Sequence, residues 1–264
     1  MILDDILRDK RFEVNSRKKR VPIDLLKKKC EMAPLPRPFS AAIKKNGGIA
    51  VISEIKKASP SKGQIVSNFD PVNIAKVYTE AGADALSVLT DEKYFEGKLE
   101  YLSIVKANTK LPVLRKDFII ESYQIYESKA AGADAVLIIA AALTDKEIKE
   151  MIELSFNMYL DVLVEVHNEK ELNAVKDIQG VKIIGINNRD LKTFDIDIGV
   201  SEKLLSHIPN EVVKVSESGL VTLSDVKRVR DAGADAILVG ESLMKSEDKG
   251  KMIKEFKIEK IKKR

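Results

Sequence analysis

Three nearly identical pentads constrain the fold of this chain more than any other feature of its 264 residues. Each reads Ala-Gly-Ala-Asp-Ala, and they occupy residues 81–85, 131–135 and 232–236. Each ends an amphipathic segment and is followed by an apolar one, as expected where a helix ends at a glycine and a buried strand begins. A strand and a helix together take about 25 residues, so the pentads fall two and four such units apart. The repeat therefore predicts a parallel sheet built of βα units.

Eight apolar segments rich in Val and Ile are expected to be strands buried on both faces. They lie at residues 49–56, 85–89, 112–116, 135–139, 161–166, 182–187, 212–216 and 236–239. Eight helices are predicted to alternate with them, at residues 71–81, 99–108, 122–131, 144–154, 169–176, 200–206, 222–232 and 249–256. The predicted fold class is α/β, a single (β/α)8 TIM barrel. A doubly wound open sheet is the alternative, and the lack of an early Gly-x-Gly-x-x-Gly turn disfavours it.

Residues 1–45 are predicted to be an N-terminal helical extension, and residues 46–264 the barrel catalytic domain. Three prolines within residues 34–38 must interrupt the helices of this arm. The arm holds 13 Lys and Arg against 6 Asp and Glu, although the whole chain has a net charge of only +4. Neither an interleaving of aromatic and basic residues nor a recognition motif accompanies this charge, so solvated helix faces are favoured over nucleic-acid binding.

The composition is that of a soluble globular protein, with 44% hydrophobic and 33% charged residues. The longest apolar stretch, Ala135 to Leu143, is too short to span a membrane. The N-terminus lacks an apolar signal segment, so we expect a cytoplasmic protein without membrane contact. The single cysteine, Cys30, excludes an internal disulfide and leaves no Cys/His cluster for a metal.

Charged side chains stand where several predicted strands end. In TIM barrels these carboxyl ends surround the active site. Side chains alternate between the two faces of a strand, so Glu54 and Lys56 share one face, whereas Arg115 and Lys116 cannot both point into the barrel. Grouping such charges in a half-buried mouth costs desolvation energy unless a ligand or mutual pairing offsets it, which favours a catalytic site. The five residues are Glu54, Lys56, Lys116, Glu165 and Glu217.

The ends of the last two predicted strands are typical of an anion cradle. Ser218-Gly219 and Gly240-Glu241-Ser242 each precede a helical segment, where backbone N–H groups converge and the helix dipole favours an anion. In barrels this is a common position for phosphate, so a phosphorylated small molecule is the expected substrate.

The remaining candidate residues carry less weight. His167 is expected to be a loop or cap residue, and His207 to complement a helix dipole. Cys30 lies in the arm, away from any strand end, which argues against a nucleophilic role. Residues 59–63 form a turn-rich loop after the first strand, in a position that suits a mobile lid over the mouth.

Over about residues 38–244 the chain resembles the indole-3-glycerol-phosphate synthase family. Several long motifs carry this resemblance in the correct order. They are the segments at residues 52–61, 89–95, 114–118, 163–166, 185–191, 217–219 and 239–240. Two positions depart from the family pattern: Ser216 stands where alanine is expected, and Glu241 lies between Gly240 and Ser242.

The resemblance implies ring closure and decarboxylation of 1-(2-carboxyphenylamino)-1-deoxyribulose 5-phosphate, with no cofactor and no metal. Lys116 and Lys56 would be the acid and carboxylate-binding pair, with Glu165 and Glu54 opposite; the sequence leaves open which lysine acts in which step. The other implied residues orient or hold the substrate. They are Asn187, Arg189 and Glu217 for the sugar and anilino parts, Phe95 and Phe118 for the aromatic ring, Ser59 for the substrate, and Ser218, Gly219, Gly240 and Ser242 for phosphate.

Two alternatives remain open at this stage. One is a related barrel enzyme, phosphoribosylanthranilate isomerase, in which a cysteine is expected near the end of the first strand; that end carries Glu54 and Lys56 here. The other is a non-catalytic barrel that binds phosphate or nucleic acid. Its binding would weaken steeply with salt. The chain is expected to be a monomer, although its residues leave the oligomeric state undecided.

Overall fold

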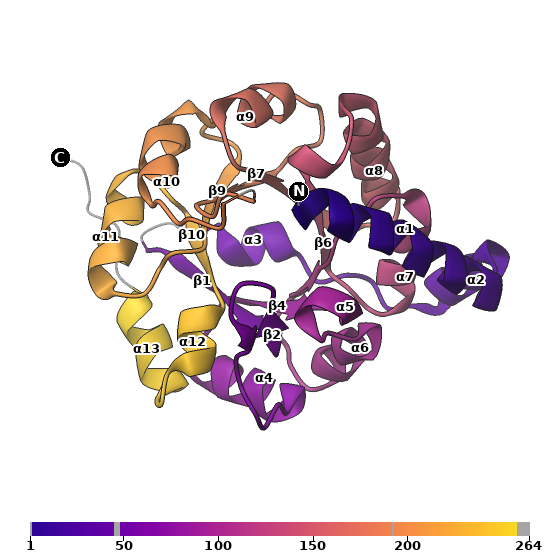
Figure 1. The fold of residues 1–264 in the computed structure, drawn as a ribbon, viewed down its shortest axis with the longest axis horizontal. Coiled ribbons are helices and arrows are strands. Elements are labelled where there is room, and N and C mark those ends of the chain that lie inside the picture. The colour runs from indigo at the N-terminus through magenta and orange to yellow at the C-terminus, as the bar shows by residue number, and fades with distance from the viewer. Residues whose placement is uncertain (1, 45–47, 192, 258–264) are drawn as a thin grey trace.

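The computed structural model describes residues 2–44, 48–191 and 193–257, and it contains a closed barrel of eight parallel strands (Figure 1). The barrel closes where the last strand pairs with the first, with Ala50 opposite Ala236. The predicted TIM barrel is therefore confirmed. The strands are β1 (Ala50–Ile55), β4 (Ala85–Leu89), β5 (Val113–Lys116), β6 (Ala135–Ile139), β7 (Asp161–Val166), β8 (Ile183–Asn187), β9 (Val213–Glu217) and β10 (Ala236–Val239).

All eight helices expected between the strands are present on the outside of the barrel. They are α4 (Pro71–Glu80), α6 (Leu99–Ala107), α7 (Ser122–Ala130), α8 (Asp145–Asn157), α9 (Glu169–Val175), α10 (Gly199–Leu204), α11 (Leu223–Asp231) and α13 (Lys249–Phe256). Asp70 caps the first turn of α4, and Thr144 forms a capping box with Glu147 at the start of α8.

Several short elements were not predicted, because segments of two to five residues carry too little periodicity. They are the hairpin of β2 (Ala58–Ser59) and β3 (Gly63–Gln64) after β1, the helix α5 (Glu92–Phe95) after β4, and the 3₁₀ turns η1 (Ala140–Ala142) and η2 (Leu205–His207). The short helix α12 (Glu241–Lys245) lies where a helical segment was expected after the last strand.

The three pentads are structurally equivalent joints between a helix and the next strand. Their glycines have positive φ angles of 84°, 86° and 108°, which ends the helix in the left-handed turn expected from the sequence. Their aspartates have a role that the sequence did not indicate. Each carboxylate accepts a hydrogen bond from the backbone N–H group at the start of a neighbouring strand. The pairs are Asp84 with Val51 (2.9 Å), Asp134 with Val113 (2.7 Å) and Asp235 with Lys214 (3.0 Å).

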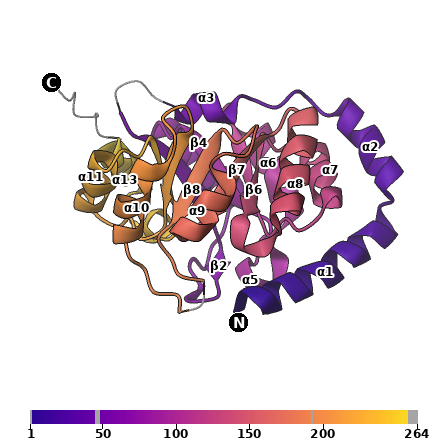
Figure 2. The ribbon, with the colours of Figure 1, turned by 90° about the horizontal axis from the view of Figure 1, so that it is seen from above.

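The core has two layers, one inside the barrel and one between the strands and the helices. The inner layer includes Ile52, Leu114 and Leu163. Phe39 and Ile43 close it at the end of the barrel where the strands begin. These two residues belong to α3 (Phe39–Ile43), which lies across the barrel end that Figure 2 shows at the top. The opposite end, where the strands finish, is therefore the open mouth.

Two further helices form the N-terminal arm, α1 (Ile2–Arg20) and α2 (Ile23–Met32). The arm runs along one side of the barrel, with α2 packed against α7 (Figures 1 and 2). The helices of the arm are interrupted at residues 33–38, where the prolines predicted an interruption. The boundary expected at residues 45/46 and the last seven residues, 258–264, lie outside the described residues.

Candidate active site

The mouth of the barrel opens into a cavity of about 960 Å³ at the carboxyl ends of the strands. Twelve of the fourteen residues proposed for the site line it: Glu54, Lys56, Ser59, Phe95, Lys116, Asn187, Arg189, Glu217, Ser218, Gly219, Gly240 and Ser242. The other two lie directly behind the lining. Glu165 contacts Lys116, and the ring of Phe118 is 6.2 Å from that of Phe95.

Alternation along β5 sends two adjacent cations to opposite sides of the strand. Lys116 points into the mouth, whereas Arg115 is fully buried in the layer outside the barrel. There the Arg115 guanidinium lies 3.0 Å from Asp117 and 2.7 Å from Glu127. The prediction that only one of the two faces inward is therefore correct.

Lys116 lies between glutamates from two other strands. Its Nζ is 2.7 Å from Oε2 of Glu165 on β7 and 3.7 Å from Oε2 of Glu217 on β9. Burial lowers the pKa of Lys116, but the neighbouring carboxylates outweigh burial and hold that pKa above its ordinary value. Lys116 therefore keeps its proton at neutral pH.

The two glutamates beside Lys116 have opposite pKa shifts. Burial raises the pKa of Glu165, but Lys116 and His167 outweigh it and hold this pKa well below the usual range. Burial, helped by the negative charges of Glu165 and Glu54, raises the pKa of Glu217 to about 8. Glu165 is thus an ionised carboxylate at neutral pH, whereas Glu217 holds a proton. Two carboxyl groups with separated pKa values are typical of acid–base sites.

A second lysine–glutamate pair lies on β1 and just after it. Nζ of Lys56 is 2.7 Å from Oε1 of Glu54, as their shared strand face predicted. Asn187 on β8 contacts the first pair, because its amide donates to Oε1 of Glu165 at 3.1 Å. The mouth therefore holds two ammonium groups, each with its own carboxylate.

The expected anion cradle follows β9 and β10. Ser218 and Gly219 have φ angles of 67° and 78°, so two successive residues adopt the left-handed conformation. A Cβ at Gly219 would overlap the side chain of Ile196, which favours glycine there. The hydroxyl of Ser242 donates to the carbonyl of Leu220 at 2.8 Å, so this side chain is already engaged.

Glu241 brings a carboxylate to the edge of this cradle. It lies 2.7 Å from Nζ of Lys245 and 3.7 Å from the guanidinium of Arg189. The negative charge is thus paired with two cations that line the same cavity.

Residues 59–63, expected as a turn-rich loop, form the tip of the β2–β3 hairpin, with Ser59 paired to Gly63. The hairpin lies at the mouth end of the barrel in Figure 2. Ser59 is buried, and within the described ranges no hydrogen-bond partner reaches its Oγ.

Sequence reasoning missed one residue of the site, His167. It was expected to be a loop or cap residue, but its Nε2 lies 3.2 Å from Oε1 of Glu165. A usable signal was present, because His167 continues the two-residue alternation of β7 that places Leu163 and Glu165 on the inner face.

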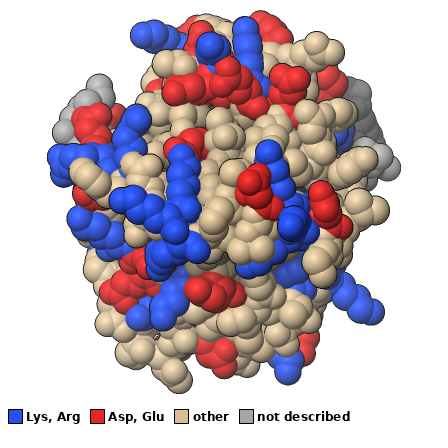
Figure 3. All heavy atoms as spheres, turned by 90° about the vertical axis from the view of Figure 1, so that its right-hand side faces the viewer, with Lys and Arg blue, Asp and Glu red and all other residues tan. Residues whose placement is uncertain are grey.

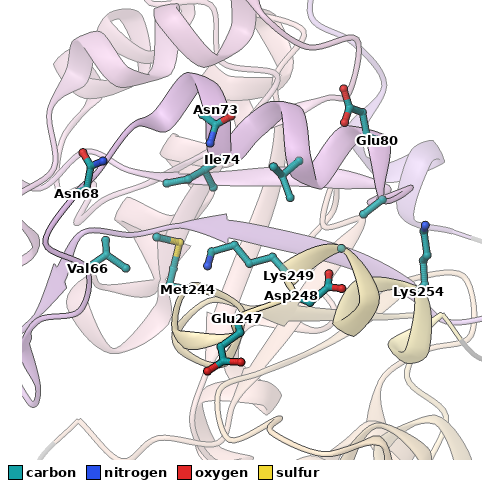
Figure 4. Close-up of a pocket in the computed structure, with 13 residues that line it drawn as sticks. Val66, Asn68, Asn73, Ile74, Glu80, Met244, Glu247, Asp248, Lys249 and Lys254 are labelled. Carbon is teal, nitrogen blue, oxygen red and sulfur yellow. The ribbon is translucent and has the colours of Figure 1, made fainter.

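A second cavity of about 480 Å³ lies outside the barrel, between α4 and the α12–α13 segment (Figure 4). Its rim mixes acids and amines, such as Glu80, Glu247 and Lys249, and none of the proposed site residues lines it. It is a surface groove, separate from the mouth.

The described part of the chain contains no group of three His, Cys, Asp or Glu residues that could hold a metal ion. Nor does any helix within it have the length and apolar character needed to cross a bilayer. On the side of the molecule that carries α2, α7 and α8, Lys and Arg are interspersed with Asp and Glu (Figure 3).

Comparisons with known proteins agree with this geometry. The family model of indole-3-glycerol phosphate synthase matches residues 3–256. Proteins of that name from Acetivibrio thermocellus and Clostridium acetobutylicum are 44% and 46% identical to the chain; each alignment covers 97% of the chain, and 99% and 97% of the respective relative. A solved structure titled KGPDC from Streptococcus mutans superposes with a TM-score of 0.60 at 11% identity, over 79% of this chain and 95% of that one. This last likeness concerns the fold alone.

Proposed function

The chain belongs to the indole-3-glycerol phosphate synthase family, and we propose that the paired lysines and glutamates at the mouth of its barrel perform the reaction of that family. The enzyme is a carboxy-lyase of tryptophan biosynthesis. It closes the ring of 1-(2-carboxyphenylamino)-1-deoxyribulose 5-phosphate and releases carbon dioxide and water to give indole-3-glycerol phosphate. The observation that carries the proposal is the position of Lys116 between Glu165 and Glu217.

Lys116 is the proposed acid. In the first step a new bond forms between the carboxylate-bearing carbon of the aromatic ring and the ketone carbon of the sugar, and the ketone oxygen takes a proton. Lys116 supplies this proton because it is held in its charged form by the surrounding carboxylates.

Lys56 is the proposed partner of the substrate carboxylate. Its ammonium group lies on the inner face with Glu54, so the substrate anion would share or replace that carboxylate. The bond from the ring to this carboxylate then breaks, carbon dioxide leaves, and the electron pair restores the aromatic ring.

Glu165 is the proposed base. The last step expels the hydroxyl as water, with a proton from an acid, while a carbon-bound proton of the former sugar is removed. Glu165 is ionised and adjoins Lys116, so acid and base act on neighbouring atoms. Glu217 keeps its proton and lines the cavity, so its neutral carboxyl group is proposed to contact a substrate hydroxyl.

The phosphate group is assigned to the cradle after β9 and β10. Ser218, Gly219 and the start of α12 line the cavity together with Arg189, so their backbone N–H groups and the guanidinium are the proposed phosphate contacts. The hydroxyl of Ser242 is occupied by Leu220, so we assign the contact to its backbone N–H rather than to its side chain. Phe95 and Phe118 are proposed to pack against the aromatic ring of the substrate.

We further propose a monomeric, cytoplasmic enzyme without a nucleic-acid partner, in which residues 1–45 extend one catalytic domain. The arm is firmly attached, since Lys10 of α1 is 1% exposed and pairs with Asp91 and Asp117 of the barrel. The mixed charges of Figure 3 argue against a continuous nucleic-acid surface.

The direct test is a spectroscopic assay of indole formation from 1-(2-carboxyphenylamino)-1-deoxyribulose 5-phosphate. Phosphoribosylanthranilate serves as the comparison substrate. Turnover of the first compound alone is the expected result. Isomerisation of the second without indole formation would overturn the proposal; it is disfavoured because Cys30 is buried in the arm and donates to the carbonyl of Tyr126.

A further inference from the structure

His167 follows the last residue of β7. One of its ring nitrogens lies near a proposed catalytic carboxylate, and the other lies near a glutamate of helix α9. Its Nε2 is 3.2 Å from Oε1 of Glu165, an ion-pair contact without the angle of a hydrogen bond. Its Nδ1 is 3.1 Å from Oε2 of Glu171 on α9. The imidazole is largely buried, with 9% of its side-chain surface exposed, and thus bridges the mouth and the outer helix layer.

Glu171 is itself held rigidly. Its Oε2 accepts a hydrogen bond from the backbone N–H of His167 at 2.8 Å, and its Oε1 accepts one from the side chain of Asn168 at 2.6 Å. Asn168 in turn caps α9 by accepting from the backbone N–H of Glu171. The first turn of α9 therefore fixes the orientation of the His167 ring.

Glu165 is contacted on both of its oxygens. Oε2 accepts from Lys116 at 2.7 Å, and Oε1 accepts from Asn187 at 3.1 Å and faces His167. Without His167, the Oε1 side would keep only the neutral amide, and the carboxylate could rotate away from Lys116. The chain of contacts Glu171–His167–Glu165–Lys116 thus begins on a helix and ends at the proposed acid.

We propose that His167, oriented by Glu171, is a positioning residue that holds the Glu165 carboxylate in the geometry and charge state needed for proton removal. This inference rests on the proposed function of Glu165. His167 itself does not line the cavity. Its effect on the reaction is exerted through Glu165, by analogy with the carboxylate-supported histidines that orient ligands in other sites.

The electrostatics support this geometry. Burial lowers the pKa of His167, but Glu165 and Glu171 outweigh burial and raise it to about 9. The groups that face the imidazole are Glu165 of β7, Glu171 of α9 and, more remotely, Glu217 of β9. The ring is thus an imidazolium at neutral pH, and its charge favours the ionised form of Glu165.

The test compares kcat, KM and the pH profile of His167→Ala, His167→Gln and Glu171→Gln. We expect kcat of His167→Ala to fall on the order of 10- to 100-fold with little change in KM, because a misplaced base slows chemistry more than binding. The acidic limb of the pH profile of this variant should move to higher pH, because loss of the positive charge of His167 raises the pKa of Glu165. His167→Gln should recover part of kcat, because its amide can donate to Glu165. Glu169→Gln, two residues before Glu171 and at an exposed position of α9, is the matched control.

A double-mutant cycle with Glu165→Gln separates a role through Glu165 from a general structural one. His167→Ala should cost much less in the Glu165→Gln background than in the wild type. Equal losses in both backgrounds, or a His167→Ala variant with wild-type kcat and acidic limb, would overturn the inference. Failure of the wild type to form indole would instead overturn the proposed function, so the two failures are distinguishable.

Discussion

The carboxylate of Glu217 occupies the space in which a side chain at position 185 would lie. Gly185 and Glu217 belong to the neighbouring strands β8 and β9, and a Cβ built on Gly185 would collide with Oε1 of Glu217 and crowd Leu163. A glycine in the middle of a strand weakens that strand, so its presence marks a close approach. Gly185 is therefore part of the reason that a third carboxyl group fits inside the mouth.

Gly185→Ala is expected to displace the Glu217 carboxyl group and lower kcat/KM on the order of 100-fold, with the barrel still folded. Steady-state kinetics and circular dichroism measure the two effects. Gly250→Ala is the control, because an added methyl there meets its nearest atom at 3.5 Å, an ordinary contact. Wild-type kinetics in Gly185→Ala would show that the function of Glu217 does not depend on the space left by glycine at position 185.

Lys116→Ala should lower kcat by roughly 100-fold or more, the scale for loss of a positioned acid. It removes the ammonium group that lies 2.7 Å from Glu165. Lys146→Ala, whose lysine side chain is 86% exposed on α8, should keep wild-type activity. Thermal unfolding checks that the Lys116 variant is folded, and near-normal turnover in it would remove Lys116 from the proposed role.

The pKa of about 8 at Glu217 predicts a pH-dependent KM. Below pH 8 this group is neutral. Above pH 8 it adds a negative charge to a mouth that must bind an anionic carboxylate and phosphate, so KM should rise several-fold between pH 7 and pH 9. The ratio of KM at pH 9 to KM at pH 7 should be smaller in Glu217→Gln than in the wild type, because glutamine cannot ionise. An identical ratio in both proteins would assign the effect to another group.

Lys10→Met should destabilise the protein by about 3–5 kcal/mol, because two barrel carboxylates would be left buried without their cation. Nζ of Lys10 lies 2.7 Å from Asp91 and 2.9 Å from Asp117. Denaturant unfolding gives the free energy. Arg8→Met on the same helix removes an exposed ion pair with Asp5 and should change stability by less than about 0.5 kcal/mol. Comparable effects of the two substitutions would contradict a buried anchor.

Inorganic phosphate should raise the melting temperature of the enzyme. At ten times its Kd a ligand adds about 1.4 kcal/mol, or about 3–5 °C for a chain of this size. Arg189→Ala should reduce the shift, because its guanidinium lines the cavity beside the cradle. Arg228→Ala, at an exposed pair with Glu202, should not. Sodium chloride at equal ionic strength is the salt control, and the same shift with chloride would argue against a specific site.

The positions of strands and helices could be predicted because each follows from a strong local signal. The apolar runs that became β4, β6 and β7 match their predicted bounds, because short runs rich in Val and Ile are typical of strands buried on both faces. Alternation also predicted that only one of Arg115 and Lys116 points inward. The hairpin at residues 58–64 and α5 escaped prediction because their form depends on tertiary contacts more than on local sequence.

The role of His167 was missed for a different reason. In the sequence it is a lone histidine after a strand, and neither Asn187 nor Glu171 reveals that it faces Glu165. The raised pKa of Glu217 likewise depends on residues of four strands meeting at one point, because Glu54, Glu165 and Lys116 are its neighbours. Such coupling between distant residues exists only once the barrel has closed.

The three pentad aspartates fasten strands at the end of the barrel remote from the mouth. Mutations there and mutations among the catalytic groups are therefore expected to be largely independent in their effects. Such a division of labour gives a protein room to acquire new substrates: the loops over the mouth can be exchanged or lengthened while the joints beneath them keep the scaffold intact. The repeated pentad thus stabilises the scaffold without constraining the residues that contact the substrate.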